Sequence, residues 1–376
     1  MPPAKASSAR TLLGHVKGKQ VIVCVGAGGV GKTTTSAALA LGLAMRGQKV
    51  AVVTIDPAKR LASSLGLTEL SGTPHRIEPG PEIAGALEIK GELWAMMLDT
   101  KGTFDGIIES LAPDQSAREE ILANPVYREL SSAVAGSQEL SAVAKLYELH
   151  EEHDFDAIVL DTPPSRNALD FLETPGRLLG FLEGRALQVF LAPSGLTGRL
   201  FGRGTALVFS IFARVTGVDM LSDLSTFFRS LGGIIEGFGE RTRGVAKLLR
   251  SSETAFLIVT SPEHEPVQEA LYLGRRLAET EMPSPWLVVN RVHTKGLDGH
   301  TVEQVQELLA GDLGEGLAGR VASNLADFDV LAGRDRNSIA HLSSSLDAAG
   351  PTLVGQLDEE VQDLLGLARI AEQLLG

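Results

Sequence analysis

The segment at residues 26–33, GAGGVGKT, limits what this chain can fold into more than any other feature. It lies between an apolar run at residues 20–25 and a long stretch rich in alanine and leucine. A strand, a GxxxxGK[ST] loop and a helix in this order form a phosphate-binding loop, in which backbone N–H groups and the helix N-terminus surround the phosphates. The alternative is a glycine-rich turn that binds nothing, and the Lys-Thr pair between a strand and a helix disfavours it.

The loop also suggests a role for each of its residues. Lys32 should neutralise the β- and γ-phosphates, the Thr33 hydroxyl should ligate Mg²⁺, and Thr34 should lie within reach of the α-phosphate. Glycine lets the backbone approach the phosphates closely. The rest of the predicted binding site is therefore Gly26, Gly28, Gly29, Val30 and Gly31. The predicted cofactors are ATP and Mg²⁺, and the predicted reaction is ATP hydrolysis.

Two aspartates follow apolar runs that read as strands. Asp56 follows residues 49–55, and Asp161 follows residues 156–160. Because ligands of an open parallel sheet bind at the carboxyl ends of its strands, both should face the phosphate loop. Asp56 is predicted to orient and polarise the attacking water, or else to cap the next helix. Asp161 is predicted to hold Mg²⁺, directly or through water, or else to act as a cap. Arg166 is either a charge partner for phosphate or a solvated surface residue.

The wider pattern predicts an α/β fold. Apolar runs alternate with helical stretches, which is typical of a doubly wound, mostly parallel sheet buried on both faces. The expected strands lie at residues 20–25, 49–55, 93–98, 156–160, 255–260, 285–289 and 320–322. Residues 71–85 should form a surface loop and residues 356–375 a packing helix. We expect one P-loop domain over residues 1–376, with a helical subdomain formed by insertions at about 103–154 and 169–250.

Charge and cysteine content exclude several classes of protein. The formal net charge of −13 argues against a nucleic-acid partner and against a polybasic membrane anchor. The single cysteine, Cys24, excludes an internal disulfide and a cysteine-rich zinc site within one chain. The N-terminus has no apolar signal region, and no run of about 18 apolar residues occurs, so we expect a cytoplasmic protein without stable membrane insertion.

Together these motifs resemble the ArsA family, which comprises the ATPase of bacterial arsenical pumps and relatives that target tail-anchored membrane proteins. The family belongs to the deviant-Walker-A P-loop ATPases, as do ParA and MinD. The resemblance rests on residues 26–33, on Asp-Pro-Ala at 56–58, on Asp-Thr at 161–162 and on the asparagine in LVVNR. It implies that Asp56 activates water and that Asn290 reads the adenine, and it extends from about residue 21 to 290.

Three departures from the family pattern bear on partners. The family's signature lysine, which reaches the nucleotide of a dimer partner, is replaced here by Ala27. The CxxC pair that joins the eukaryotic targeting dimers through zinc is missing, as are the arsenic-binding cysteines of the pump ATPase. The protein is therefore predicted to form either a homodimer or a heterodimer with a paralogous ATPase that retains the lysine. In a homodimer, a local cation such as Lys59, Arg60 or Arg166 would supply the missing charge.

The sequence leaves several functions open. Nine of the thirteen phenylalanines lie between residues 171 and 238, so the helices of 169–250 are predicted to form an apolar groove for hydrophobic or membrane-protein client segments. A plain helical core is the alternative interpretation of this region. A subunit that energises an anion or metalloid transporter, a ParA- or MinD-like positioning ATPase and a small-molecule synthase are the other hypotheses.

Overall fold

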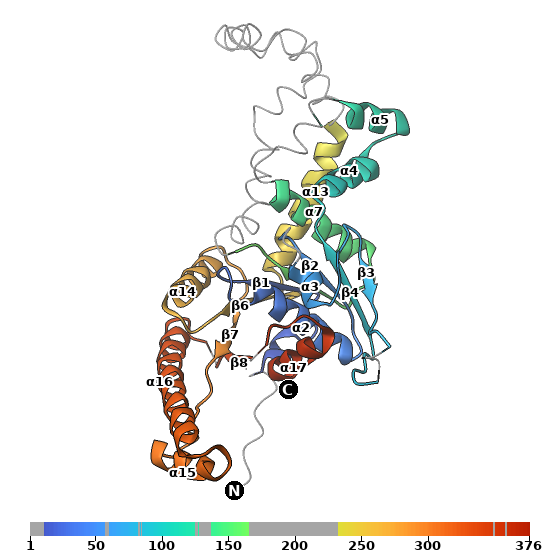
Figure 1. Cartoon of the computed structure of the whole chain (residues 1–376). Helices are drawn as coiled ribbons and strands as arrows, with labels where there is room; N and C mark the ends of the chain where they lie inside the picture. The colour runs from blue at the N-terminus through green and yellow to red at the C-terminus, as the bar shows by residue number, and fades with distance from the viewer. Residues whose placement is uncertain are drawn as a thin grey trace, which may run out of the picture. The chain divides into compact units, whose positions relative to one another are not determined.

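The computed structural model describes residues 11–56, 60–81, 83, 85–124, 127, 137–164, 232–348, 350–357 and 359–376 (Figure 1). Within it the chain divides into two compact units. The first comprises Met1–Met97, Phe155–Leu169 and Arg250–Gly376, and the second comprises Leu98–Asp154 and Asp170–Leu249. The first unit contains the sheet and the phosphate loop.

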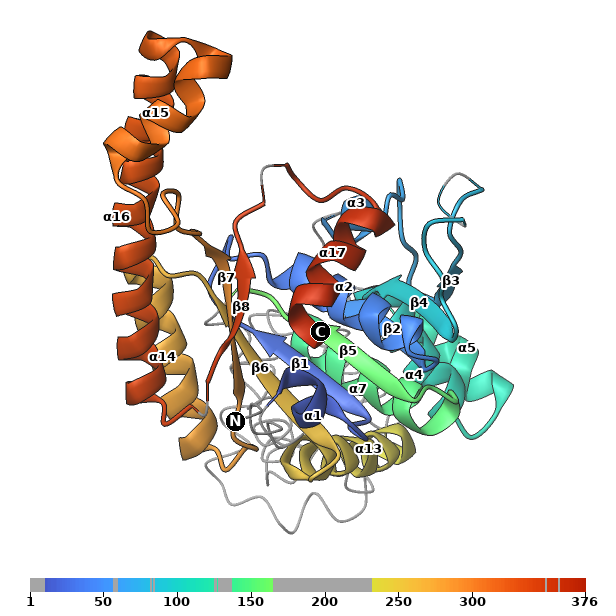
Figure 2. The same cartoon turned by 90° about the horizontal axis from the view of Figure 1, so that it is seen from below.

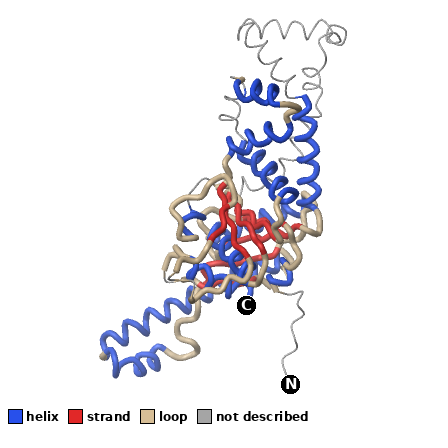
Figure 3. The backbone as a smooth tube through the Cα atoms, turned by 90° about the vertical axis from the view of Figure 1, so that its right-hand side faces the viewer, coloured by secondary structure: helices blue, strands red, loops and turns tan. Residues whose placement is uncertain are grey.

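The first unit is built on one eight-stranded sheet (Figure 3). In chain order its strands are β1 (Val21–Val25), β2 (Lys49–Thr54), β3 (His75–Ile77), β4 (Glu92–Met97), β5 (Ala157–Asp161), β6 (Thr254–Thr260), β7 (Trp286–Val292) and β8 (Thr352–Gly355). Their spatial order is β3-β4-β2-β5-β1-β6-β7-β8. All neighbouring strands are parallel except β3 and β4, so the predicted doubly wound, mostly parallel fold is confirmed.

The strand order determines where a ligand can bind. The central strand β1 pairs with β5 on one side and β6 on the other, and the chain continues from β1 to β2 in one half of the sheet and later to β6 and β7 in the other. This reversal is the topological switch point of a doubly wound sheet, where ligands bind beyond the carboxyl ends of the strands. The phosphate loop follows β1 at this point.

The first unit also contains helices, most of which flank the sheet, while one hairpin of helices extends away from it (Figure 2). They are α1 (Leu12–Val16), α2 (Lys32–Met45), α3 (Arg60–Ser64), α14 (His264–Glu279), α15 (Val302–Leu313), α16 (Glu315–Ser345) and α17 (Leu364–Leu375). α2 packs against α17, and their apolar side chains join those of the central strands in one buried core. α14 packs on β6, and α16 lies beside α14 and pairs with α15 in a hairpin. No helix within the described ranges is both long and apolar enough to cross a membrane.

The second unit is helical in the part that the structure describes. Its helices are α4 (Thr100–Leu111), α5 (Gln115–Ala123), α7 (Ser137–Glu152) and α13 (Gly232–Arg250). α4, α5, α7 and α13 share a small core of Ile107, Ile108, Ile121, Tyr127, Ala144 and Ile234. Most of the sequence predicted to form the client groove, residues 165–231, lies outside the described residues.

The structure corrects four details of the predicted elements. The strand expected at residues 320–322 is wrong, because these residues lie inside the 31-residue helix α16, where Ala318 and Ala322 are buried. The loop expected at 71–85 contains strand β3, which pairs antiparallel with β4. Strand β8, four residues long at the sheet edge, was not anticipated. The C-terminal helix begins only at Leu364, because the Asp363 side chain caps it by accepting from the N–H of Gly366 at 2.7 Å.

Candidate active site

The phosphate loop lies against the sheet, and two of its glycines are required by geometry. Gly31 caps α2 with φ of +89°, a left-handed conformation that residues with a side chain rarely adopt. A Cβ atom on Gly26 would overlap the carbonyl oxygen of Val259 on the neighbouring strand β6. The loop backbone therefore lies close to the strand ends, in the conformation that leads into α2.

Lys32 is buried beneath the loop that it belongs to. Its side chain is only 7% exposed, and Nζ donates a hydrogen bond to the backbone oxygen of Ala27 at 2.8 Å. Burial lowers the pKa of Lys32, while the carboxylates of Asp161 and Asp56 act to raise it. A buried cation that donates to a carbonyl oxygen of its own loop can exchange that oxygen for a phosphate oxygen, so the geometry suits an anionic ligand.

The carboxylate of Asp161 contacts the first turn of α2. It is completely buried at the end of β5, and its Oδ2 atom accepts from the hydroxyls of Thr33 at 2.8 Å and Thr54 at 2.9 Å. Its other oxygen, Oδ1, is buried and has no hydrogen-bond partner among the described residues. Burial raises the pKa of Asp161 to about 6, although both hydroxyls and the charge of Lys32 act to lower it.

This arrangement fits a magnesium ion. Mg²⁺ prefers oxygen ligands, and a buried carboxylate oxygen without a donor gains most from a cation placed beside it. Asp161 Oδ1 and the Thr33 hydroxyl are the two groups that would hold the ion. No cluster of three or more His, Cys, Asp or Glu side chains occurs in the described part of the chain. A metal there would therefore depend on these two groups together with phosphate oxygens and water.

Asp56 follows β2 at the same edge of the sheet. Its carboxylate is partly exposed, and its charge contributes to the pKa of both Lys32 and Asp161. Helix α3 begins at Arg60, and residues 57–59 between them lie outside the described residues. The structure thus brings Asp56 close to the phosphate loop, and its role toward water stays a prediction.

Asn290 also lies at the phosphate loop. Its Nδ2 atom donates to the backbone oxygen of Val30 at 2.9 Å, and the same amide lies against Gly31. The pairing of β7 with β8 shifts register between Val289 and Val292, and Arg291 has φ of +60°. An irregularity of this kind redirects side chains at the end of a strand. The hydrogen bond to Val30 uses one N–H of the Asn290 amide. The contact of Asn290 with adenine stays a prediction.

Other predicted residues have different outcomes. Thr34 lies in the first turn of α2, directly after Thr33. Arg60 lies near enough for its charge to act on the pKa of Lys32. Lys59 and Arg166 lie outside the described residues.

Two threonines at the site make contacts that the sequence analysis does not predict. Thr54 binds Asp161, and Thr162 fixes the start of the following loop because its hydroxyl donates to the backbone oxygen of Cys24 at 2.8 Å. A signal for each existed in the sequence, since each is a hydroxyl residue at the end of an apolar run.

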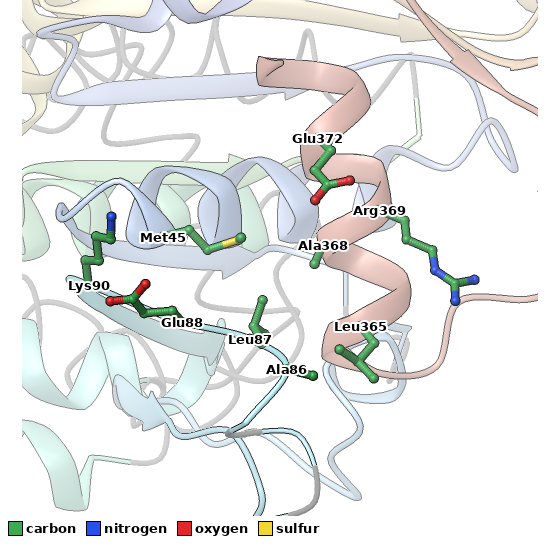
Figure 4. A pocket seen from close by; sticks show the side chains of 9 residues that line it. All are labelled: Met45, Ala86, Leu87, Glu88, Lys90, Leu365, Ala368, Arg369 and Glu372. Carbon is green, nitrogen blue, oxygen red and sulfur yellow. The ribbon is translucent and has the colours of Figure 1, made fainter.

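A cavity of about 380 Å³ lies elsewhere in the first unit (Figure 4). It is lined by Met45, Ala86, Leu87, Glu88, Lys90, Leu365, Ala368, Arg369 and Glu372. Met45 is the last residue of α2, so at 1.5 Å per residue this cavity is about 20 Å from Lys32. Its lining mixes both signs of charge and includes no residue of the phosphate loop, so it belongs to a different surface.

Curated proteins similar to this chain are named as ATPases. It is 28% identical over 257 residues to a putative arsenical pump-driving ATPase 1 of Aquifex aeolicus (strain VF5), which covers 67% of this chain and 58% of that protein. It is 28% identical over 218 residues to ATPase GET3 of Malassezia globosa, covering 55% and 59%, respectively. It is 29% identical over 269 residues to ATPase get3 of Schizosaccharomyces japonicus, covering 71% and 72%. The chain thus spans about three fifths of the length of the first two.

A family model agrees with these similarities. The model of the ArsA ATPases, described as anion-transporting ATPases, matches residues 19–307. The match includes the phosphate loop, both aspartates and Asn290. This chain therefore belongs to the ArsA ATPase family.

Proposed function

We propose that this protein hydrolyses ATP with the help of Mg²⁺ at the phosphate loop. The observation that carries the proposal is the convergence of Lys32, Thr33 and Asp161. A buried cation and a hydroxyl hydrogen-bonded to a buried carboxylate lie at the N-terminus of one helix. These are the groups that phosphoryl transfer requires, because the reaction depends on positioning and charge neutralisation more than on covalent chemistry.

Each residue has one task in this proposal. The loop N–H groups and Lys32 bind the phosphates, and Thr33 and Asp161 hold the metal ion, which supplies further positive charge to the phosphate oxygens. Asp56 accepts a hydrogen bond from the attacking water and orients it. The amide of Asn290 has both a donor and an acceptor, which match the N6 and N7 positions of adenine.

We further propose that nucleotide controls the binding of hydrophobic client segments. Support comes from the phenylalanine-rich sequence at 169–250 and from the relatives named ATPase GET3. Chain connectivity adds to it. Leu98, where the second unit begins, directly follows β4, and Asp170, where it resumes, comes nine residues after Asp161. Strand β5, which ends at Asp161 in the proposed nucleotide site, thus leads into the helical unit within a few residues.

Site-specific photo-crosslinking tests the client proposal. Crosslinkers at Phe209 and Phe212, which lie outside the described residues, should capture a synthetic transmembrane-like peptide of about 20 apolar residues. Capture should differ between ATP and ADP. A crosslinker at Tyr272, which is 43% exposed on α14 in the first unit, is the matched control and should capture little. Capture that is equally absent with ATP, ADP and no nucleotide would favour a plain helical core.

The second candidate function is a subunit that energises a membrane transporter. The Aquifex relative is named as pump-driving, and the family is described as anion-transporting. Metalloid binding through thiolates has little support, because the single cysteine, Cys24, is buried and burial raises its pKa to about 12. Stimulation of ATP turnover by an oxyanion such as arsenate or phosphate, without any effect of hydrophobic peptide, would favour this candidate over the first.

A positioning ATPase of the MinD type would need an exposed amphipathic helix. The apolar face of α17 is not exposed, because Leu367, Ala371, Leu374 and Leu375 are buried in the core with α2.

As for partners, we propose a dimer. Ala27 offers no charge to a second subunit, so either a local cation such as Arg60 or a lysine from a paralogous partner completes the site.

A further inference from the structure

Thr54 contacts Asp161 but has no task in the proposed mechanism. It is the last residue of β2, and its parallel neighbour β5 ends at Asp161. The register of the two strands places Thr54 directly beside Asp161, and the N–H of Ile55 donates to the backbone oxygen of Asp161 at 3.0 Å. The two residues are therefore held together by the sheet itself before any side chain interacts.

The side chains then make an asymmetric arrangement. Thr54 is 2% exposed, and its hydroxyl donates to Asp161 Oδ2 at 2.9 Å. Thr33 donates to the same oxygen at 2.8 Å, whereas Oδ1 has no partner in the described part of the chain. Because both hydroxyls donate to Oδ2, they fix the rotation of the carboxylate and leave Oδ1 directed away from them.

The two hydroxyls are not equivalent. Thr33 belongs to the phosphate loop, and its oxygen is a predicted ligand of the metal. Thr54 comes from a strand in the core, and a hydroxyl has a single proton to donate. At 2.9 Å that proton goes to Asp161, because the other acceptor within reach, the backbone oxygen of Asp56, is at 3.5 Å. Thr54 is thus the donor that stays fixed while Thr33 engages the ion.

We propose that Thr54 is a positioning residue for magnesium, which holds Asp161 Oδ2 so that Oδ1 is presented to the ion or to its bound water. This inference rests on the proposed function, since it assumes that the site binds MgATP. Residues that orient a metal ligand typically change metal affinity by about 10- to 100-fold when they are replaced. A structural role alone, in which Thr54 only satisfies its own hydroxyl in the core, predicts lost stability with unchanged Mg²⁺ dependence.

The test measures binding of the non-hydrolysable analogue AMP-PNP by calorimetry over a series of free Mg²⁺ concentrations. Thr54→Val should raise the half-effective Mg²⁺ concentration by about 10-fold while the affinity in EDTA stays that of the wild type. Thr54→Ser keeps the hydroxyl and should stay within about threefold of the wild type. Thr254→Val is the matched control. Thr254 is also a buried threonine, but it lies at the amino end of strand β6, whereas the phosphate loop lies at the carboxyl ends of the strands. If Thr54→Val does not fold, Thr54→Ala replaces it.

The outcomes separate this inference from the proposed function. Wild-type Mg²⁺ dependence in Thr54→Val, or an equal loss of affinity with and without Mg²⁺, overturns the positioning role alone. If the wild-type protein does not bind AMP-PNP, or binds it with the same affinity at every Mg²⁺ concentration, the proposed function is overturned and the inference with it.

Discussion

Replacing Asp161 with asparagine should change how the stability of the metal-free protein depends on pH. The pKa of this buried carboxyl is raised from 3.8 to about 6. A folded-state pKa above the unfolded value means that the native state binds the proton more tightly. The stability contributed by the protonated form is therefore complete at low pH and is lost as pH rises through about 6. At about 1.4 kcal/mol for each pKa unit, the loss amounts to about 3 kcal/mol, about half of it between pH 5 and 7.

Urea unfolding in EDTA at several pH values measures this effect. Both tryptophans, Trp94 and Trp286, lie in the sheet of the first unit, so their fluorescence reports the unfolding of the unit that holds Asp161. The unfolding free energy of Asp161→Asn, relative to wild type, should increase by about 1–2 kcal/mol from pH 5 to 7. Asp312→Asn on exposed α15 controls for the loss of one carboxyl. Parallel pH profiles of Asp161→Asn and wild type would refute the reasoning.

Three further variants or preparations test other parts of the site. Asp56→Asn should bind AMP-PNP with wild-type affinity, but its single-turnover rate of ATP hydrolysis should fall by about 100-fold or more, since a positioned base contributes that much. An unchanged rate would show that Asp56 has only a structural role. Asn290→Ala should lower the ratio of ATP to GTP affinity, and an unchanged ratio rules out adenine reading. The chain purified alone should show low turnover that a paralogue retaining the lysine increases. If the chain alone is a stable homodimer with full turnover that no paralogue changes, a paralogous partner is excluded. Loss of that turnover in Arg60→Ala would then identify Arg60 as the cation that replaces the lysine.

Much of the site could be predicted because its chemistry is local in the sequence. The phosphate loop needs its glycines, lysine and threonine at consecutive positions, so the motif itself specifies a strand, a turn and a helix. Asp56 and Asp161 were found by a simple rule, since each follows an apolar strand and carboxyl ends of parallel strands share one edge. Asn290 is implied by the family resemblance. Its hydrogen bond to Val30 shows that it lies at the phosphate loop, and its contact with adenine stays a prediction.

The contacts that escaped prediction depend on long-range register. Thr54 and Asp161 are 107 positions apart, and nothing local indicates that β2 lies beside β5 in the register that pairs them. Short edge strands such as β8 escaped for a related reason, because four residues of partly exposed strand carry little hydrophobic pattern. Residues 320–322, which lie within α16, resemble a strand in sequence because three residues are too few to distinguish the helical period of 3.6 from the strand period of 2.

The central claim is that Lys32 and the loop around it support ATP hydrolysis. Its most direct test is Mg²⁺-dependent phosphate release from ATP by the wild-type chain and by Lys32→Ala, measured alone and with the paralogous partner proposed above. Lys17→Ala, which removes an exposed lysine before β1, is the matched control. We expect turnover in the wild type and in the control, and about a 1,000-fold loss in Lys32→Ala, since a cation at the transferred phosphate is worth about that much. Turnover of Lys32→Ala equal to that of the wild type would contradict the account.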